Sequence, residues 1–339
     1  MDLTILNINA WHGMYARTWW KAERLEPNGR KEERERALVD AIALIAPEVV
    51  TLQECYPQPG FSKRLAAALD MDAIAPVSNG GVRVLGAGLP TGVDTGEGMS
   101  ILAKRGLGLR ALGATNLSGA GFTTPLLSFQ VMRRTQAIAA EVTKGGKTLA
   151  LVTGHVRYEW PTIEAFFAAW AELRAAGAVS GEPDDSIVRS VRANLAVRDS
   201  EISVLSSWVA RHAQERPVVV AADLNVDDDA PQLVKMLSEL GLTSVLQAKD
   251  DRRPTWDPAR NANIAYSSSY AHPDGSKKDV ASLIVAQHDR MTQRPDHVLV
   301  GKTFSDGSIG HARVVFDEAQ DGRVLPSDHF GILATIELD

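Results

Sequence analysis

The sequence predicts an α/β protein built on mixed β-sheets. Residues 3–9 are mostly apolar and β-favouring, residues 31–46 have helical spacing, and residues 49–53 form a second β-favouring run. This β-α-β order is typical of a sheet covered by helices. Strands predicted at 136–143 and 148–153 flank a Gly-Gly turn and form a hairpin. Because hairpins and helical crossovers alternate along the chain, mixed sheets are favoured over a purely parallel one.

The first helix is predicted from its apolar spacing and its flanking residues. Asn28-Gly29 indicates a turn before it, and Pro47 ends it. Its first turns are charged. Its apolar face is formed by Leu38, Ile42 and Ile45.

The later elements follow the same patterns. Residues 187–212 place apolar side chains every three or four positions and predict a long helix, capped by Asp185 or Ser186. Residues 80–98 are rich in glycine but lack the lysine and spacing of a P-loop, so they predict a flexible loop and not a phosphate cradle. Further strands are predicted at 98–103, 218–222, 298–300 and 332–336.

Length and composition bound the domain count and the cellular setting. The chain has 339 residues, which suits two ordinary domains or one large α/β sandwich. With 45% hydrophobic and 23% charged residues, it is globular and not disordered. Its one cysteine, Cys55, excludes an internal disulfide and any cysteine-based zinc or iron–sulfur site, and is interpreted as a small buried hydrophobe.

Charge and hydropathy limit the partners. The net charge of −6 gives no support for non-specific coating of nucleic acid, although a nuclease whose metal ion meets the phosphate remains compatible with it. No apolar run reaches the length of a membrane span, and residues after Met1 show no signal-peptide pattern. We therefore expect a cytoplasmic protein without a transmembrane segment, with secretion after removal of a leader as the alternative. The oligomeric state is not predicted.

Polar side chains follow the predicted strands where each strand ends, and such strand ends are where α/β folds usually place their sites. Together they are oxygen ligands and histidines, with no thiolate. Carboxylate and amide oxygens suit a hard cation such as Mg²⁺, with Mn²⁺ or Ca²⁺ as alternatives, and a histidine backed by a carboxylate transfers protons near neutral pH. These residues are Asn9, Glu54, His155, Asp223, Asn225, Asp296, Asp328 and His329.

The order of these segments resembles the endonuclease/exonuclease/phosphatase superfamily, the DNase I-like fold. Thr51-Leu52-Gln53-Glu54 is similar to its "LQE" motif and Ser327-Asp328-His329 to its "SDH" motif. The resemblance implies one catalytic domain over 1–339, a four-layer α-β-β-α sandwich of two mixed β-sheets. The other matching segments are 6–11, 98–102, 153–155, where Gly154 replaces the family's Thr, 222–225 and 294–297.

The resemblance also implies roles on the metal side of the site. Glu54 would be the main ligand of the metal, assisted by Asn9 rather than Asn7, and Asp328 would lie beside it. Such an ion polarises a phosphoryl oxygen and screens the charge of the transition state.

The remaining roles concern the water and the phosphate. His329 would act as general base or stabilise the phosphorane, oriented by Asp296. Asp223 would position or deprotonate the attacking water. Asn225 and His155 would donate hydrogen bonds to phosphate oxygens. Proline at 295 departs from the family pattern and, having no N–H, predicts that the strand starts at Asp296.

The substrate is narrowed by Pro254-Thr255-Trp256-Asp257-Pro258, followed by Asn261. This segment resembles one in neutral sphingomyelinases, although an indole packed under a loop would explain Trp256 equally well. We expect a metal-dependent phosphodiester hydrolase that cleaves a phospholipid headgroup or small phosphodiester by in-line attack of water. A nuclease, less favoured by the charge, a phosphomonoesterase and a non-catalytic binding protein are the alternatives.

Two insertions are predicted, a helical lid at 156–197 and a loop-rich segment at 247–293. The lid helix opens at Trp160-Pro161 and ends at Gly177. Its aromatic residues Phe166, Phe167 and Trp170 either meet substrate or lipid or, as we favour, pack the helix onto the body. The same two interpretations apply to Trp19 and Trp20. We expect Arg133, Arg134 and Arg157 either to contact phosphate or to be solvated. The residues not expected at the site are Tyr158, Tyr266, Tyr270, His272 and His288.

Overall fold

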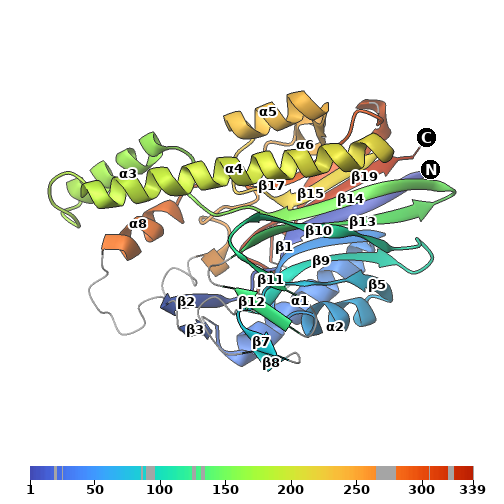
Figure 1. Ribbon diagram of the computed structural model, residues 1–339, viewed down its shortest axis with the longest axis horizontal. Helices are drawn as coiled ribbons and strands as arrows, with labels where there is room; N and C mark the ends of the chain where they lie inside the picture. Colours follow the sequence, from blue (N-terminus) through green and yellow to red (C-terminus); the bar gives the residue numbers. More distant parts are fainter. Residues whose placement is uncertain are drawn as a thin grey trace.

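The chain folds into four layers, with two β-sheets packed face to face and helices on both outer surfaces (Figure 1). This computed structural model confirms the predicted α-β-β-α sandwich. It describes residues 1–18, 21–24, 26–84, 87–88, 96–123, 127–130, 134–264, 280–304, 306–319 and 324–338.

The first sheet has β1 (Asp2–Asn9) and β4 (Val49–Cys55) as a parallel pair at its centre, and its other pairings are antiparallel. β6 (Val77–Asn79) pairs with β9 outside the main path. In order, the strands are β18 (Ile309–Val315), β19 (Gly331–Glu337), β1, β4, β9 (Glu97–Lys104) and β5 (Met71–Ile74).

The second sheet repeats this plan, with β14 (Lys147–His155) and β15 (Val218–Asp223) as its parallel pair. The predicted hairpin is confirmed, because β13 (Thr135–Lys144) pairs with β14 across Gly145-Gly146. Both glycines have positive φ, which a tight two-residue turn requires. The strand order is β10 (Arg110–Ser118), β13, β14, β15, β17 (Asp296–Val300) and β16 (Thr243–Ser244).

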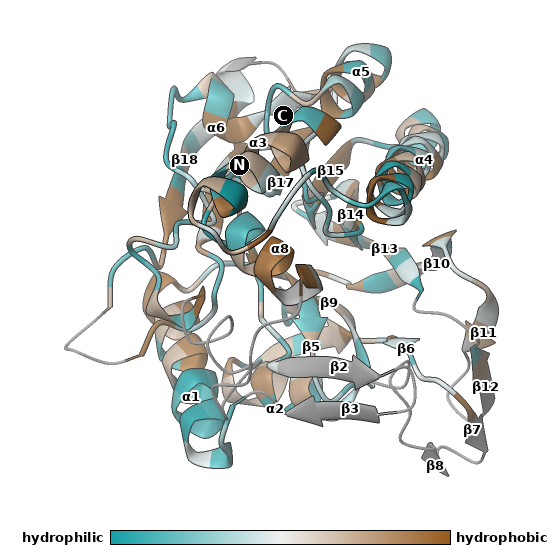
Figure 2. Cartoon of the chain, turned by 90° about the vertical axis from the view of Figure 1, so that its left-hand side faces the viewer, coloured by the Kyte–Doolittle hydropathy of each residue, from teal (hydrophilic) through white to brown (hydrophobic). Residues whose placement is uncertain are grey.

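Helices cover the outer faces of the sheets. α1 (Asn28–Ile45) and α2 (Gly60–Ala68) lie on the first sheet, and α4 (Asp185–Glu215) and α5 (Pro231–Leu240) on the second (Figure 1). Near the start of α4, α3 (Ile163–Ala175) and α8 (Val280–His288) lie side by side (Figures 1 and 2). The short elements are α6 (Val245–Ala248), η1 (Asp306–Ser308), β2 (Met14–Thr18), β3 (Lys21–Arg24), β7 (Arg83–Val84), β8 (Ala87–Gly88), β11 (Gly121–Thr123) and β12 (Leu127–Gln130).

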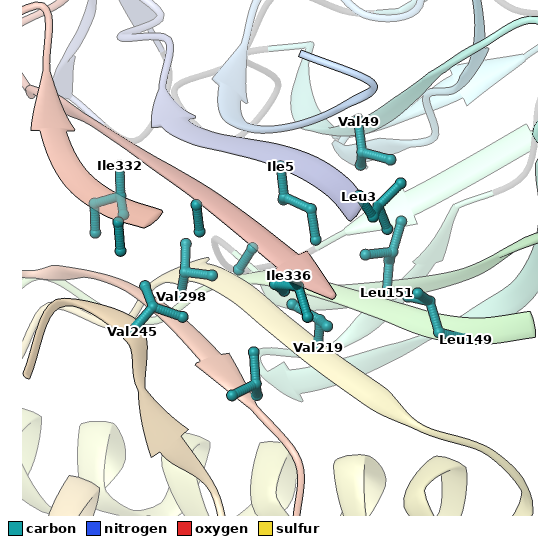
Figure 3. Packing of buried hydrophobic residues seen from close by; sticks show 14 of the residues in the cluster. Leu3, Ile5, Val49, Leu149, Leu151, Val219, Val245, Val298, Ile332 and Ile336 are labelled. Carbon is teal, nitrogen blue, oxygen red and sulfur yellow. The ribbon is translucent and has the colours of Figure 1, made fainter. Parts of the chain in front are cut away.

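The main core lies between the sheets and is aliphatic. Leu3 and Ile5 of β1 point into it and meet Leu151 and Val219 of the second sheet (Figure 3). The alternate side chains of β1 point the other way, where Leu6 packs with the helix α1. This alternation follows from the two-residue period of a strand, so every second residue of a central strand faces the other sheet.

The buried face of α1 continues beyond its apolar residues into a buried ion pair. Arg34 lies one turn before Leu38 and is only 1% exposed. Its guanidinium pairs with the buried Glu26 at 2.7 Å and donates to the carbonyl oxygens of Ala10 at 2.7 Å and Trp11 at 2.9 Å. Arg34 therefore fixes the backbone that follows β1.

Several local expectations were wrong. Asn28-Gly29 is not a turn, because both residues belong to the first turn of α1 and Pro27 is its N-cap. The N-cap of α4 is Asp184, whose carboxylate accepts from the N–H of Ser186, so the helix starts ahead of both predicted caps. Within the predicted loop 80–98, the described residues include β7 and β8.

Other expectations concern missed or undescribed parts. The strands β10 and β18 were not predicted, since both run along sheet edges with many exposed residues and lack a clear apolar run. Of the predicted loop-rich segment 247–293, residues 265–279 lie outside the described residues. Among the helices that are described, none is long and apolar enough to cross a membrane.

The ion pair of Arg34 yields a test of stability. Arg34→Ala would leave the buried Glu26 carboxylate with the more distant Arg30, whose Nε is 3.9 Å from Oε1, so the free energy of unfolding should fall by about 3 kcal/mol. Arg36→Ala, two residues along on the exposed face of α1, is the matched control and should change it by less than about 0.5 kcal/mol. Equilibrium urea unfolding measures both, and equal small losses would contradict the role given to Arg34.

Candidate active site

The inner faces of the sandwich change from aliphatic to polar at one end. Along the inner face of β1, Leu3 and Ile5 are followed by Asn7 and Asn9, all of them buried. The same change occurs in four other strands. They run from Val49 to Gln53, from Leu149 to His155, from Val219 to Asp223 and from Val300 to Asp296.

A cavity of about 450 Å³ opens at this polar end. That volume is within the roughly 300–1,000 Å³ typical of small-ligand sites. Of the predicted site residues, six line it directly, and they come from both sheets. They are Glu54, His155, Asp223, Asn225, Asp328 and His329.

Asn9 joins the two sheets at the base of the cavity. Its Nδ2 donates to Asp223 Oδ2 at 2.9 Å and to Glu54 Oε1 at 3.3 Å. Asn7 instead lies deeper, where its Oδ1 accepts from Gln53 Nε2 at 2.9 Å. The structure thus brings together Asn9, Glu54 and Asp223, and leaves Asn7 in the network between the sheets.

An unusual backbone conformation positions the side chains of Glu54 and Asn225 at the cavity. Glu54 and Asn225 both have φ of +51°, a left-handed conformation that costs a non-glycine residue roughly 1–3 kcal/mol. Each lies where its strand turns into a loop, and each lines the cavity. Strain of this kind collects at functional sites, because the surrounding structure must hold it.

His329 is held by a carboxylate on the neighbouring sheet. Its Nδ1 hydrogen-bonds Asp296 Oδ2 at 2.8 Å, which leaves Nε2 toward Asp223 Oδ2 at 4.0 Å. β17 begins at Asp296, as the proline before it predicts. The edge of the Trp256 indole packs on the His329 ring with centroids 5.0 Å apart. Trp256 also lines the cavity, so it is both packed and part of the site.

Burial and crowding of like charges shift the titration of these groups. Burial, with repulsion from Asp296, raises the pKa of Asp223 to about 6, and burial raises the pKa of Asp328 to about 7. For His329, burial lowers the pKa, but the carboxylates of Asp296, Asp223 and Asp328 outweigh it and raise the pKa to about 10. These shifts indicate that the pocket carries an excess of negative charge.

His155 and Asn225 complete the predicted set. His155 Nε2 is 3.6 Å from Glu54 Oε1 and 3.6 Å from Asp223 Oδ2. Asn225 Nδ2 donates to the carbonyl oxygen of Val156 at 2.8 Å, so one of its two amide hydrogens serves the protein and not a phosphate. Glycine at 154 costs the site nothing, because that position faces Leu205 of α4.

The donor set fits a hard divalent cation. Glu54, Asp223 and Asp328 supply carboxylate oxygens, which such ions prefer. Asn9 here turns its Nδ2 to Glu54 and Asp223, while its Oδ1 accepts from the Trp11 N–H at 2.9 Å, so its amide would have to turn over to offer oxygen to an ion. Asp296 Oδ1 is buried without a hydrogen-bond partner, and the raised pKa values of Asp223 and Asp328 show that added positive charge would stabilise the pocket. Within the described residues, Asp223, Asp296 and His329 offer ligand atoms that all lie within 4.8 Å of one another.

Sequence reasoning missed several residues of the site. His12 Nε2 lies 3.2 Å from Glu54 Oε2 and 3.1 Å from Glu97 Oε2, and both His12 and Glu97 line the cavity. The only signal for them was position, since His12 follows the first strand and Glu97 starts the strand β9. Tyr158, excluded in the sequence analysis, also lines the cavity, while His288 lies buried behind it.

The aromatic residues of the lid helix are mostly structural. Phe166 and Trp170 are buried in a cluster with Trp160 and Val191, while Phe167 is 38% exposed. This supports packing of α3 onto the body. Arg134 and Arg157 line the cavity. The residues that lie outside the described part of the chain are Trp19, Trp20, Arg133, Tyr266, Tyr270 and His272.

Solved structures share this fold at low sequence identity. TDP2 of D. rerio, crystallised with a single-stranded DNA product, matches over 99% of each chain with a TM-score of 0.57 and 18% identity. An endonuclease/exonuclease/phosphatase of Bacteroides vulgatus matches over 100% of each chain, with a TM-score of 0.59 and 14% identity. A mannosyl-6-phosphatase of Bacteroides thetaiotaomicron matches over 98% of each chain, with a TM-score of 0.56 and 13% identity.

Sequence comparison identifies the family. No curated protein sequence matches the chain. The profile of the Endonuclease/Exonuclease/phosphatase family matches residues 6–329, which span every element that contributes to the cavity. The chain therefore belongs to the endonuclease/exonuclease/phosphatase family of phosphoester hydrolases.

Proposed function

We propose that this protein is a metal-dependent phosphodiester hydrolase in which water attacks phosphorus in line with the leaving oxygen. The observation that carries the proposal is the convergence of Glu54, Asp223 and His329, from three distant parts of the chain, on one cavity. Glu54, Asn9 and Asp328 would hold the ion, which we propose to be Mg²⁺, with Mn²⁺ or Ca²⁺ as alternatives. When bound, such an ion polarises a phosphoryl oxygen and screens developing charge.

The protein's own groups divide the remaining work. Asp296 accepts from His329 Nδ1 and thereby directs Nε2 into the cavity. Because the surrounding carboxylates raise the pKa of His329 to about 10, the ring is protonated near neutral pH and would stabilise the phosphorane. It would take a proton from water only when a bound cation lowers that pKa. Asp223 lies between His329 and His155 and would position the attacking water. His155 and the free amide hydrogen of Asn225 would donate to phosphate oxygens.

The cavity favours a small phosphodiester. Trp256 lies in the cavity, as a sphingomyelinase-like headgroup site would require, but Phe166 and Trp170 are buried and supply no lipid-facing surface. The net charge of −6 disfavours a long polyanion. Nucleic acid and phosphomonoesters remain alternatives because relatives of this fold include TDP2 with a DNA product and a mannosyl-6-phosphatase. We place the activity in the cytoplasm, where a buried thiol such as Cys55 stays reduced.

Metal removal tests the class of reaction. Purified protein should hydrolyse bis(p-nitrophenyl) phosphate with Mg²⁺, Mn²⁺ or Ca²⁺ and lose that activity in EDTA, because without a cation the carboxylates of the pocket repel the phosphate. A parallel screen of p-nitrophenyl phosphate, single-stranded and duplex DNA, and sphingomyelin ranks the substrate classes. Turnover of none of them with any of the three ions would reject the proposal.

Variants test the two ends of the site. Glu54→Gln and His329→Ala should each lower kcat/KM by on the order of 100-fold or more, because one removes a metal ligand and the other a proton-transfer group. Glu32→Gln and His311→Ala, which change exposed residues, are the matched controls and should retain wild-type rates. Near-wild-type activity in Glu54→Gln or His329→Ala would remove that residue from the mechanism.

A third variant separates orientation from binding. Asp296→Asn keeps the size of the side chain but loses the charge that holds His329 Nδ1, so kcat should fall about tenfold or more while KM changes little. Thermal unfolding checks that the fold is kept. A rise in KM at constant kcat would show that Asp296 serves substrate binding and not the orientation of His329.

A further inference from the structure

The far end of the cavity is built by segments that lie outside the family motifs. The loop after β14, the first half of α4 and the end of α8 meet there, where Figures 1 and 2 show α3, α4 and α8 grouped at one end of the sandwich. The residues that line this far end are Arg157, Tyr158, Glu159, Asn194, Val285 and Asp289. The catalytic proposal uses none of them.

One wall of this end is held by Asp289. The Tyr158 hydroxyl donates to Asp289 Oδ1 at 2.6 Å, and Trp256 Nε1 donates to the Asp289 carbonyl oxygen at 3.2 Å. His288 packs edge-on against Tyr158 at 4.3 Å and Trp160 at 4.8 Å, which anchors the end of α8. Asp289 is thereby held at the cavity, and among the described residues the side chain that it bonds through Oδ1 is Tyr158.

The opposite wall is a chain of polar side chains. Arg157 donates from Nη1 to Asn194 Oδ1 at 3.2 Å, and Glu159 Oε1 accepts from the backbone N–H of Trp160 at 3.0 Å. The backbone N–H of Arg157 donates to the buried Glu201 at 2.7 Å, which fixes the start of this segment. Within the described part of the chain, Arg157 Nε is buried with no hydrogen-bond partner, and Glu201 Oε1 lies 3.8 Å from it.

These walls present acceptors and donors together. Glu159 and Asp289 offer carboxylate oxygens, and burial raises the pKa of both, to about 6 for Asp289, because neither is well solvated. Arg157 offers guanidinium hydrogens on the same face. A cationic group would be repelled by Arg157, and an anionic group would be repelled by the carboxylates of Glu159 and Asp289. A hydroxyl group both donates and accepts, so several hydroxyls satisfy all three side chains.

We propose that this end of the cavity binds the alcohol portion of the substrate and that this alcohol is a compact polyol such as a sugar. The proposal rests on the phosphoester hydrolysis proposed above and names the group attached to the phosphate. Val285 and Trp256 line the cavity beside these polar groups and supply a small apolar surface for the C–H groups of a sugar. A longer polyanion is opposed at this end by Glu159 and Asp289.

A matched set of chromogenic diesters tests the proposal. Each is a p-nitrophenyl phosphodiester whose second alcohol is a hexose, ethanol, choline or a phosphorylated alcohol, assayed with Mg²⁺. The hexose diester should have a kcat/KM at least about tenfold above the others, since it alone satisfies both walls. Equal rates, or a preference for choline or for the phosphorylated alcohol, would overturn this inference while leaving phosphoester hydrolysis intact. Turnover of none of the set would instead reject the proposed function, and this inference with it.

Variants locate the preference in the structure. Asp289→Asn keeps an acceptor for Tyr158 but loses the charged acceptor, so the hexose-to-ethyl ratio of kcat/KM should fall roughly tenfold to a hundredfold. Glu164→Gln changes an exposed carboxylate of α3 and should leave that ratio unchanged. An unchanged ratio in Asp289→Asn would contradict the assignment.

Binding without turnover gives an independent readout. Calorimetric titration of Glu54→Gln with a hexose 6-phosphate should show saturable binding that weakens about tenfold or more when Asp289→Asn is added. Ethyl phosphate should bind the two proteins equally. Loss of affinity for both ligands would indicate general damage to the cavity and would overturn the specific role of Asp289.

Discussion

The site depends on one constraint, which is that each central strand of the sandwich turns from aliphatic to polar at the same end of its inner face. Leu3 and Ile5 pack between the sheets, and Asn9, two pleats further along the same face, bonds Asp223 on the opposite sheet at 2.9 Å. Because strands alternate their side chains, a shift of pairing by one residue would turn these groups to the outer faces. The aliphatic core therefore sets the register that places Glu54, Asp223 and His329 together.

Burying several carboxylates at the polar end of the sandwich destabilises the fold, and contacts from the outer helices hold the loops at that end in place. The described carboxylates at this end include Glu54, Glu97, Asp223, Asp296 and Asp328, and the pKa values of Asp223 and Asp328 are raised by burial and repulsion. Arg34 reaches from α1 to the backbone after β1, and Glu201 reaches from α4 to the backbone after β14. Each of these buried charges fixes a loop that leaves a central strand. A bound cation would relieve the remaining excess of negative charge.

Most of the sandwich could be predicted from sequence, and the reasons are local. The strands around Ile5, Leu52 and Val220 are mostly apolar and end in polar residues, and the ordered motifs indicated which polar residues share a site. The edge strands β10 and β18 lacked that pattern, because exposed edges carry mixed residues. Tyr158 and Asp289 could not be placed, since their meeting depends on how α8 packs and not on any spacing along the chain.

A double-variant cycle on the rate of diester hydrolysis tests most directly whether the two sides of the pocket act on one chemical event. The measured values are kcat/KM for wild type, Glu54→Gln, His329→Ala and the protein with both changes. If the two groups act in one step at one phosphate, kcat/KM of the double variant should fall about as far as that of the more impaired single variant. Losses that multiply fully would show that the residues act independently and would contradict the shared pocket.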